Sequence, residues 1–365
     1  MRLVMIWLGP VPRRGVSVAE TWTVGKMLKW TEGYLKRKGD ERPRLSAEWL
    51  LCNVTGLSRV QVYMDFDRPM VRDELDRMHQ VVVRRGRGEP LQYVTGEMPF
   101  RHIVLRCEEG VLIPRPETEI LVDAALEGVD QAPMTFPPVM GEGPSSEPSE
   151  GDDADGGDAG AEDGSAADDG GEDGGEVRGE PVQVLPAGCR VLEVGTGTGC
   201  IALSIAGERP GTRVVATDLS PKAIALATRN RDALSLQDAV TIVECDLASG
   251  VDQGLMGTFS VLVSNPPYIP SKVLANEVPS EVRDHEPALA LDGGEDGLDV
   301  FRRLLELAPR ALAPGGTFCV ELYEGALDAA ATLARGTGEW ESVEIREDLT
   351  HRPRVLVCRL ARRDS

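Results

Sequence analysis

Few aromatic residues, few histidines and no paired cysteines occur in this chain of 365 residues. Aromatic side chains make up 4% of the residues, and the 4 histidines, at positions 79, 102, 285 and 351, do not cluster. The 7 cysteines are scattered, and none forms a CxxC pair. The chain therefore lacks the usual ligand spacing of a zinc site and the framework of a disulfide-rich secreted protein. We predict reduced thiols, no bound metal and a cytoplasmic location.

Long apolar runs are also missing, and none is long enough to cross a bilayer as a helix. The first residues, MRLVMIWLGPVPRRG, place a short apolar patch ahead of a basic one. A secretory signal peptide has the opposite order and a longer apolar region. We expect no association with a membrane, and we expect residues 1–17 to form a disordered extension.

The acidity of the chain is concentrated in one segment. Of the formal net charge of −21, about −14 comes from residues 141–180, which hold 15 acidic residues, one arginine and 12 glycines. This stretch has no Leu, Ile, Phe, Trp or Tyr, so it cannot bury enough apolar surface to offset its chain entropy. We predict an acidic, glycine-rich disordered insert over residues 128–186. The overall acidity also argues against strong non-specific binding to nucleic acid.

The regions on either side of this insert have different patterns. Apolar residues recur at helical spacing and predict about four short helices in an N-terminal domain over residues 18–88. We assign substrate recognition to this domain because it is too small to hold much catalytic machinery. Residues 89–127 predict a β-hairpin linker with its turn at Glu108–Gly110, followed by a helix that opens after Pro116.

From Cys189 onward strands and helices alternate, which predicts an α/β domain over residues 187–362 with a parallel sheet covered on both faces. The last two strands have no predicted helix between them, so they are expected to form an antiparallel hairpin at the sheet edge. The expected strands are CRVLEV, RVVATD, VTIVEC, FSVLVSN, GGTFCVELY, WESVEIRE and PRVLVCRLA.

The segment VLEVGTGTGC places several glycines between the first strand and its helix, where the backbone can approach a ligand closely. The second strand ends at Asp218, whose carboxylate can accept hydrogen bonds from both ribose hydroxyls of a nucleoside. We therefore predict a nucleoside cofactor at the switch point of the sheet. The residues of this segment assigned to cofactor binding are Glu193, Gly195, Thr196, Gly197, Thr198 and Gly199.

Two nucleoside cofactors compete for this site. A dinucleotide site prefers GxGxxG with a pyrophosphate at the helix N-terminus, whereas the spacing here is GxGxG. Glu193 lies two residues ahead of the first glycine and favours a cationic sulfonium and amine over an anion. S-adenosylmethionine therefore fits better than NAD. Asp246, followed by Leu247, ends the third strand and is a candidate acceptor for an adenine amine.

The fourth strand ends in the sequence Asn265-Pro266-Pro267-Tyr268, on the same sheet edge as the cofactor segment. The Asn265 side-chain oxygen and the Pro266 carbonyl can accept the two N–H groups of a planar amine or amide. Because proline locks φ, these acceptors are held rigidly. The ring of Tyr268 offers a face for stacking. We predict Asn265, Pro266 and Tyr268 as catalytic residues and all four as substrate-binding residues.

Asn-Pro-Pro-Tyr with a GxGxG segment resembles the amino-group methyltransferases, which modify adenine, guanine or glutamine nitrogens. GEPLQYVTGEMPF (88–100) and LIPRPETEILV (112–122) are similar to the linker and pre-sheet segment of the HemK-type peptide chain release factor glutamine methyltransferases. HRPRVLV near the C-terminus also resembles the last strand of that family. The resemblance covers about residues 18–360, apart from the insert.

This resemblance implies a Rossmann-like class I S-adenosylmethionine-dependent methyltransferase sheet of seven strands, with a small N-terminal helical domain. It implies methyl transfer from S-adenosylmethionine to the side-chain amide nitrogen (N5) of the glutamine in the Gly-Gly-Gln motif of class I peptide chain release factors. It also places Arg115, in the PRPETE segment, near the substrate pocket, with Phe100 as a further candidate. Neither direct contact with nucleic acid nor an oligomer is expected.

The chain departs from the family pattern at three places. Glu193 stands where an aspartate is common, and Leu247 stands where some relatives have an aromatic residue, which puts adenine stacking there in doubt. The acidic insert replaces a connection that is usually short.

Three alternatives remain open at this point. A DNA adenine-N6 or ribosomal RNA guanine-N2 methyltransferase shares the Asn-Pro-Pro-Tyr motif but needs a basic face. A ribosomal-protein glutamine methyltransferase is a second alternative, against which the PRPETE segment argues. A non-enzymatic binding module is a third, and the intact cofactor and acceptor motifs argue against it.

Overall fold

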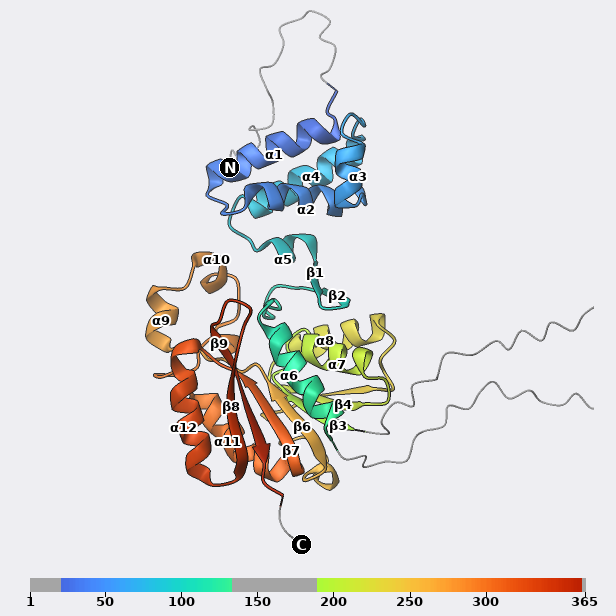
Figure 1. Cartoon of the computed structure of the whole chain (residues 1–365). Coiled ribbons are helices and arrows are strands. Elements are labelled where there is room, and N and C mark those ends of the chain that lie inside the picture. The colour runs from blue at the N-terminus through green and yellow to red at the C-terminus, as the bar shows by residue number, and fades with distance from the viewer. Residues whose placement is uncertain (1–20, 133–188, 363–365) are drawn as a thin grey trace, which may run out of the picture.

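The computed structural model describes residues 21–132 and 189–362 (Figure 1). The predicted extension over residues 1–17 lies outside these ranges, as does most of the predicted insert over residues 128–186. No helix in these two ranges is long and apolar enough to cross a membrane.

Four helices form the N-terminal domain, as the apolar spacing predicted. They enclose a core of aliphatic and methionine side chains that includes Met27, Leu50 and Met78. The helices are α1 (Val24–Lys38), α2 (Pro43–Thr55), α3 (Arg59–Met64) and α4 (Arg72–Arg85). Helix α1 begins where the Thr23 hydroxyl accepts a hydrogen bond from the Lys26 backbone N–H.

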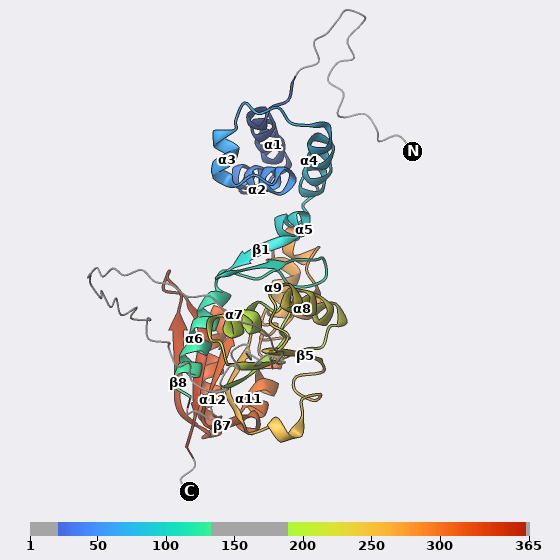
Figure 2. The ribbon, with the colours of Figure 1, turned by 90° about the vertical axis from the view of Figure 1, so that its right-hand side faces the viewer.

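A short linker joins this domain to the sheet domain below it, as Figure 2 shows. It consists of α5 (Leu91–Thr95) and a hairpin of β1 (Glu97–Phe100) and β2 (Ile103–Arg106). The predicted turn at Glu108–Gly110 was wrong for this hairpin. Phe100 pairs directly with Ile103, so the turn consists of Arg101 and His102.

The side chain of Arg101 explains why the hairpin turns there. Arg101 adopts a φ of 49° and donates from Nε to Glu208 at 2.6 Å and from Nη1 to Asp123 at 2.7 Å. These charged contacts attach the hairpin to two helices of the sheet domain. Residues 108–110 form a separate turn after the second strand, closed by the Val111 N–H on the Glu108 carbonyl.

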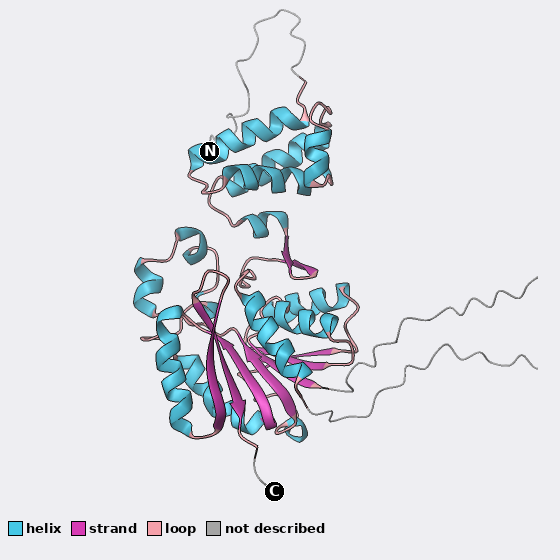
Figure 3. Ribbon diagram, in the orientation of Figure 1, coloured by secondary structure: helices cyan, strands magenta, loops and turns pink. Residues whose placement is uncertain are grey.

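One sheet of seven strands forms the second domain, in the order β5-β4-β3-β6-β7-β9-β8 (Figure 3). Within this sheet, strands β3 to β7 are parallel to one another, and β9 pairs antiparallel with both β7 and β8. The predicted final hairpin is therefore confirmed. The strands are β3 (Arg190–Val194), β4 (Arg213–Asp218), β5 (Val240–Glu244), β6 (Phe259–Ser264), β7 (Leu312–Glu321), β8 (Trp340–Glu347) and β9 (Pro353–Leu360).

Helices cover both faces of this sheet, and the strands are buried on both sides. Along β6, Val261 and Val263 pack with α6 and α7, whereas Leu262 packs with α11 and α12 on the other face. The helices are α6 (Thr118–Asp130), α7 (Cys200–Glu208), α8 (Pro221–Ala233), α11 (Asp299–Ala311) and α12 (Leu327–Thr337). Helix α6 runs three residues beyond the expected boundary at residue 127.

Two features of the sheet domain are additional to the sequence-based prediction. Helix α12 connects β7 to β8 and was not predicted, although its buried residues Leu327, Ala330, Ala331 and Ala334 recur at helical spacing. The segment between β6 and α11 contains two short helices, α9 (Ser271–Asn276) and α10 (Ser280–Arg283), followed by the 3-10 turn Ala288–Ala290. This segment returns to the sheet edge where β6 ends, because Ile269 and Asp292 form a bridge.

Candidate active site

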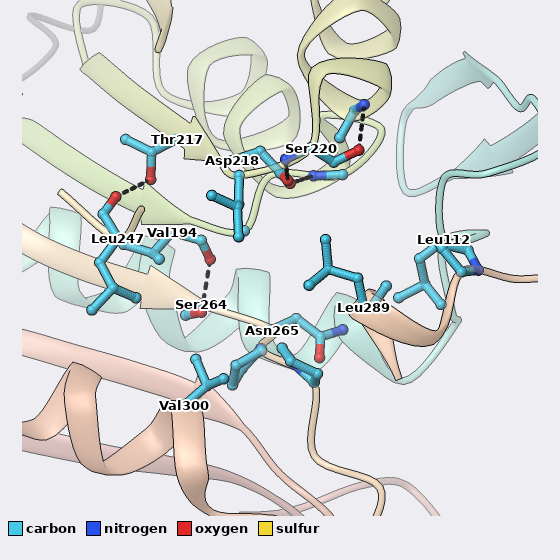
Figure 4. A pocket seen from close by; sticks show the side chains of 18 of the residues that line it. Leu112, Val194, Thr217, Asp218, Ser220, Leu247, Ser264, Asn265, Leu289 and Val300 are labelled. Atoms are coloured by element: carbon cyan, nitrogen blue, oxygen red, sulfur yellow. Dashed lines mark hydrogen bonds between the residues drawn. The ribbon is translucent and has the colours of Figure 1, made fainter. Parts of the chain in front are cut away.

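A cavity of about 220 Å³ lies at the carboxyl ends of the parallel strands, where a doubly wound sheet binds its ligands. The loops after four adjacent strands contribute to its wall: Gly195 and Gly197 after β3, Asp218 at the end of β4, Asp246 after β5, and Asn265 after β6. Figure 4 shows Asp218 and Asn265 on opposite sides of the cavity. The main motifs predicted from the sequence therefore meet at one place.

The glycine segment forms the floor of this cavity. Gly195 and Gly197 have φ values of 79° and 56°, in the left-handed region that side chains disfavour. The N–H groups of Gly195 and Thr196 both donate to the Thr217 carbonyl, at 2.8 and 2.9 Å, which ties the loop to β4. Because Gly195 and Gly197 have no side chains, their backbone atoms are accessible to a ligand in the cavity.

Glu193 stabilises the glycine loop from behind. Its side chain is fully buried and is not on the cavity wall. Oε2 accepts from the Thr196 hydroxyl at 2.6 Å and from the Ala202 N–H at 3.2 Å, while Oε1 has no partner in the described ranges. Burial raises the pKa of Glu193 to about 8. The carboxylate expected to face a cationic ligand therefore supports the loop that the ligand would contact.

Asp218 is held at the end of β4 by the backbone around it. Oδ2 accepts from the Gly197 N–H at 2.9 Å, and Oδ1 accepts from the Ser220 N–H at 2.8 Å. Burial raises the pKa of this carboxyl above its ordinary value, against the effect of these backbone hydrogen bonds. A carboxylate has about four lone-pair positions, so the two bonds leave Asp218 able to accept from two hydroxyl groups.

Asp246 and Leu247 lie on the wall next to Asp218. Asp246 is half-exposed and forms an ion pair of 2.6 Å with Arg303 of α11, which also lines the cavity. Leu247 has a φ of 50°, and its carbonyl accepts from the Thr217 hydroxyl at 2.7 Å (Figure 4). Leu247 therefore contributes an apolar surface at the position where some relatives have an aromatic residue.

The Asn-Pro-Pro-Tyr segment divides into two parts. Asn265, Pro266 and Pro267 line the cavity. The Nδ2 of Asn265 donates to the Thr118 hydroxyl at 3.1 Å, and no described residue donates to its Oδ1. Tyr268 instead packs against the sheet core and donates its hydroxyl to Glu321 at 3.0 Å. The predicted stacking role of Tyr268 remains a prediction.

Other predicted site residues lie away from the cavity. Phe100 is 1% exposed, packs in the core beneath α6 and does not line the cavity, so its contact with substrate remains a prediction. Thr198 is buried, and Gly199 caps α7 against Leu203. Arg115 makes a 2.6 Å ion pair with the buried Glu286, which fixes the PRPETE segment to the segment after β6.

Comparison with known proteins decides the family. A model described as the PrmC N-terminal domain matches residues 26–96, and one described as the methyltransferase small domain matches residues 181–295. A release factor glutamine methyltransferase of Geobacter sulfurreducens is 36% identical over 87% of this chain and 90% of its own. That of Deinococcus radiodurans is 36% identical over 92% and 98%. The chain belongs to the release factor glutamine methyltransferase family.

Membership of this family confirms the resemblance predicted from the sequence. A third relative, from Rhodopirellula baltica, carries the same name and is 34% identical over 92% of this chain and 95% of its own. The matches extend across both domains. The chain is therefore a methyltransferase, and family membership argues against the nucleic-acid methyltransferases and the binding module considered above.

The sequence-based prediction missed part of the methyltransferase cavity. Leu219, Leu289 and Val300 contribute apolar surface to the cavity wall. Leu112 of the pre-sheet segment also lines the cavity and lies near Leu289 (Figure 4). Leu289 lies in the segment after β6, which carries no recognisable motif. Thr118 lies in the PRPETE segment quoted above, and its hydroxyl group was the only feature of the sequence that indicated a role in the site.

The charges on the cavity wall fit S-adenosylmethionine. The charged side chains there are Asp218, Asp246 and Arg303, and the arginine is already paired with Asp246. Such a wall offers no cationic site for a pyrophosphate, whereas it suits a cationic nucleoside with hydroxyl donors. Asp218 would hold the ribose, and the apolar walls would enclose the base. The expected cofactor therefore agrees with the residues present.

Proposed function

We propose that this protein transfers a methyl group from S-adenosylmethionine to the N5 amide nitrogen of the glutamine in the Gly-Gly-Gln motif of class I peptide chain release factors. The observation that carries this proposal is the state of Asn265 on the cavity wall. Its Nδ2 is engaged by Thr118, and its Oδ1 has no donor among the described residues. An acceptor is thus available beside the predicted cofactor site.

The segment after β6 acts as a clamp for the glutamine amide. An amide nitrogen is a poor nucleophile because its lone pair is delocalised into the carbonyl group. Oδ1 of Asn265 accepts one N–H, and the Pro266 carbonyl accepts the other, which raises the electron density on nitrogen and fixes its direction. When bound, S-adenosylmethionine supplies an electrophilic methyl group, which leaves sulfur as the new N–C bond forms. The surplus proton then passes from nitrogen to water.

The glycines beside the target glutamine have no side chains, so such a loop can enter a narrow cavity. A three-residue loop offers too little contact for selective binding, which requires a second surface. We assign that surface to the helical domain. Direct contact with nucleic acid and a stable oligomer are not part of this proposal.

Incubation with labelled S-adenosylmethionine and purified release factor, followed by mapping of the methyl group, tests the proposal. We expect label on the glutamine of Gly-Gly-Gln and much faster transfer to the intact factor than to a short peptide. Equal efficiency on both substrates would contradict the second surface. Transfer to DNA or ribosomal RNA without protein substrate would overturn the function itself.

A further inference from the structure

The orientation of the Asn265 amide decides whether the clamp functions. An asparagine side chain presents an acceptor on one side and two N–H donors on the other, and rotation by 180° exchanges them. Only an oxygen directed at the substrate can accept its N–H. Rotation would direct the N–H groups of Asn265 Nδ2 at the N–H groups of the substrate glutamine and repel its amide. Something in the protein must therefore select one of two nearly isosteric orientations.

Thr118, the first residue of α6, is the residue in contact with this amide. Its side chain is 1% exposed, and its oxygen accepts from Asn265 Nδ2 at 3.1 Å. A hydroxyl group can also donate, and a threonine that donated to Asn265 would favour the rotated amide. The hydroxyl proton of Thr118 must therefore be directed elsewhere if Asn265 is to remain in the productive orientation.

Glu321, at the end of β7, supplies that direction. Its side chain is 2% exposed, and Oε1 accepts the Tyr268 hydroxyl at 3.0 Å. Oε2 is buried without a hydrogen bond of standard geometry in the described ranges. The Thr118 hydroxyl also interacts with this carboxyl and opposes the rise in its pKa that burial causes. Oε1 is thus engaged by Tyr268, and Oε2 is left as the buried acceptor toward which the Thr118 hydroxyl can donate.

We propose that Thr118 and Glu321 are positioning residues that hold the Asn265 amide with Oδ1 directed at the substrate. The Thr118 hydroxyl donates its hydrogen bond toward Glu321, and the Thr118 oxygen accepts from Asn265 Nδ2. This inference rests on the function proposed above. A buried carboxyl group without an ion-pair partner lowers stability relative to an apolar side chain of the same size, so packing alone does not account for Glu321 at this position.

Paired variants of Thr118 separate the hydroxyl from the volume of the side chain. Thr118→Val should lower kcat for the release factor at least tenfold and change the Kd of S-adenosylmethionine less than twofold. Thr118→Ser should remain within threefold of wild type, because it restores the hydroxyl. Thr31→Val is the matched control, since Thr31 is buried in α1 and its Oγ1 has no hydrogen-bond partner in the described ranges.

Variants of Glu321 test the next contact. Glu321→Gln keeps an oxygen that can accept from Thr118 and can direct its NH2 at the Tyr268 oxygen. Glu321→Met removes both acceptors at similar volume. We expect kcat to fall more for Met than for Gln, with thermal unfolding recorded for both. Wild-type kcat in Thr118→Val, or equal losses in Thr118→Val and Thr118→Ser, would overturn the proposal.

A measurement without turnover separates this proposal from the proposed function. The side-chain NH2 signals of Asn265, assigned by their loss in Asn265→Asp, should exchange slowly with solvent in the wild-type protein. Exchange should accelerate at least tenfold in Thr118→Val. Unlabelled release factor together with slow exchange would reject the function and keep the positioning. Rapid exchange in the wild type would reject the positioning.

Discussion

The guanidinium of Arg85, on the last turn of α4, donates from Nη1 to Oε1 of Glu281 on α10 at 2.8 Å, although 196 positions separate the two residues in sequence. Arg85 is nearly buried and also donates from Nε to Asp40 at 2.7 Å. Its contacts connect the helical domain to the segment after β6. That same segment contributes Leu289 to the cavity wall, so the two domains are linked next to the candidate active site.

Removal of the charge on Glu281 should therefore impair substrate binding more than cofactor binding. In Glu281→Gln we expect the KM for the release factor to rise about three- to tenfold, because the helical domain is held less firmly over the cavity. The Kd of S-adenosylmethionine should change less than twofold in calorimetry. Glu277→Gln, an exposed change on the same segment, is the control. An unchanged KM in Glu281→Gln would show that the contact does not affect docking.

Asn265→Ala should abolish methyl transfer while the Kd of S-adenosylmethionine stays within a few-fold, because it removes one of the two acceptors for the substrate amide. Asn265→Asp should retain more activity than Asn265→Ala, since it keeps an acceptor oxygen. Single-turnover assays with release factor measure both variants, and thermal unfolding checks that each is folded. Near-wild-type turnover in Asn265→Ala would remove the basis of the clamp.

Asp218→Ala should weaken S-adenosylmethionine binding at least tenfold, equivalent to about 1.4 kcal/mol. The variant loses the predicted ribose acceptors and also the hydrogen bond from the Gly197 N–H that orders the loop. Asp218→Asn helps to separate these effects. Its single side-chain oxygen can still accept from the Gly197 N–H, but the second acceptor oxygen of the carboxylate is lost. Calorimetry gives the affinities, and an unchanged Kd in Asp218→Ala would place the nucleoside elsewhere.

Glu193 should make folding stability depend on pH. Its pKa is about 8 in the folded protein against an ordinary value of 4.5, so the folded state binds the proton more tightly. Its stabilising contribution is therefore complete below about pH 4.5 and is lost as the pH rises to about 8. Glu193→Gln cannot ionise and should avoid this loss, which is on the order of a few kcal/mol.

Urea unfolding of wild type and Glu193→Gln at several pH values between 5 and 8.5 measures this effect. The free energy of unfolding of the wild type should fall relative to that of the variant across this range. Glu244→Gln, at the exposed end of β5, should follow the wild-type curve. Parallel curves for wild type and Glu193→Gln would show that Glu193 does not carry the expected proton.

Phe100→Ala should reduce stability without changing the cofactor affinity of the folded fraction. Truncation of a fully buried phenylalanine costs about 3–5 kcal/mol, and Phe100 is 1% exposed. Val104→Ala, 57% exposed on the same hairpin, should cost less than about 0.5 kcal/mol. Chemical unfolding compares the two. If Phe100→Ala kept normal stability but bound the release factor more weakly, Phe100 would contact the substrate despite its burial.

The sequence alone determined the α/β architecture and the residues at the strand ends, because these depend on local patterns. Alternating strands and helices require a parallel sheet, and the carboxyl ends of its strands meet at one edge. Gly195, Gly197, Asp218 and Asn265 could therefore be assigned to one edge of the sheet from their positions in the sequence. The turn of the hairpin could not be predicted from the sequence, since the Arg101 turn is held by contacts with Asp123 and Glu208 on distant helices.

Only the tertiary structure decided which of these side chains face the cavity and what holds them. Thr118 contacts Asn265 across 147 positions, and Tyr268 contacts Glu321 across 53. Glu193 faces the back of its loop because a fully buried carboxyl group needs hydrogen-bond partners, which Thr196 and the backbone supply. Hydrogen bonds and burial between distant segments arise from packing of whole elements, and short sequence patterns do not encode that packing.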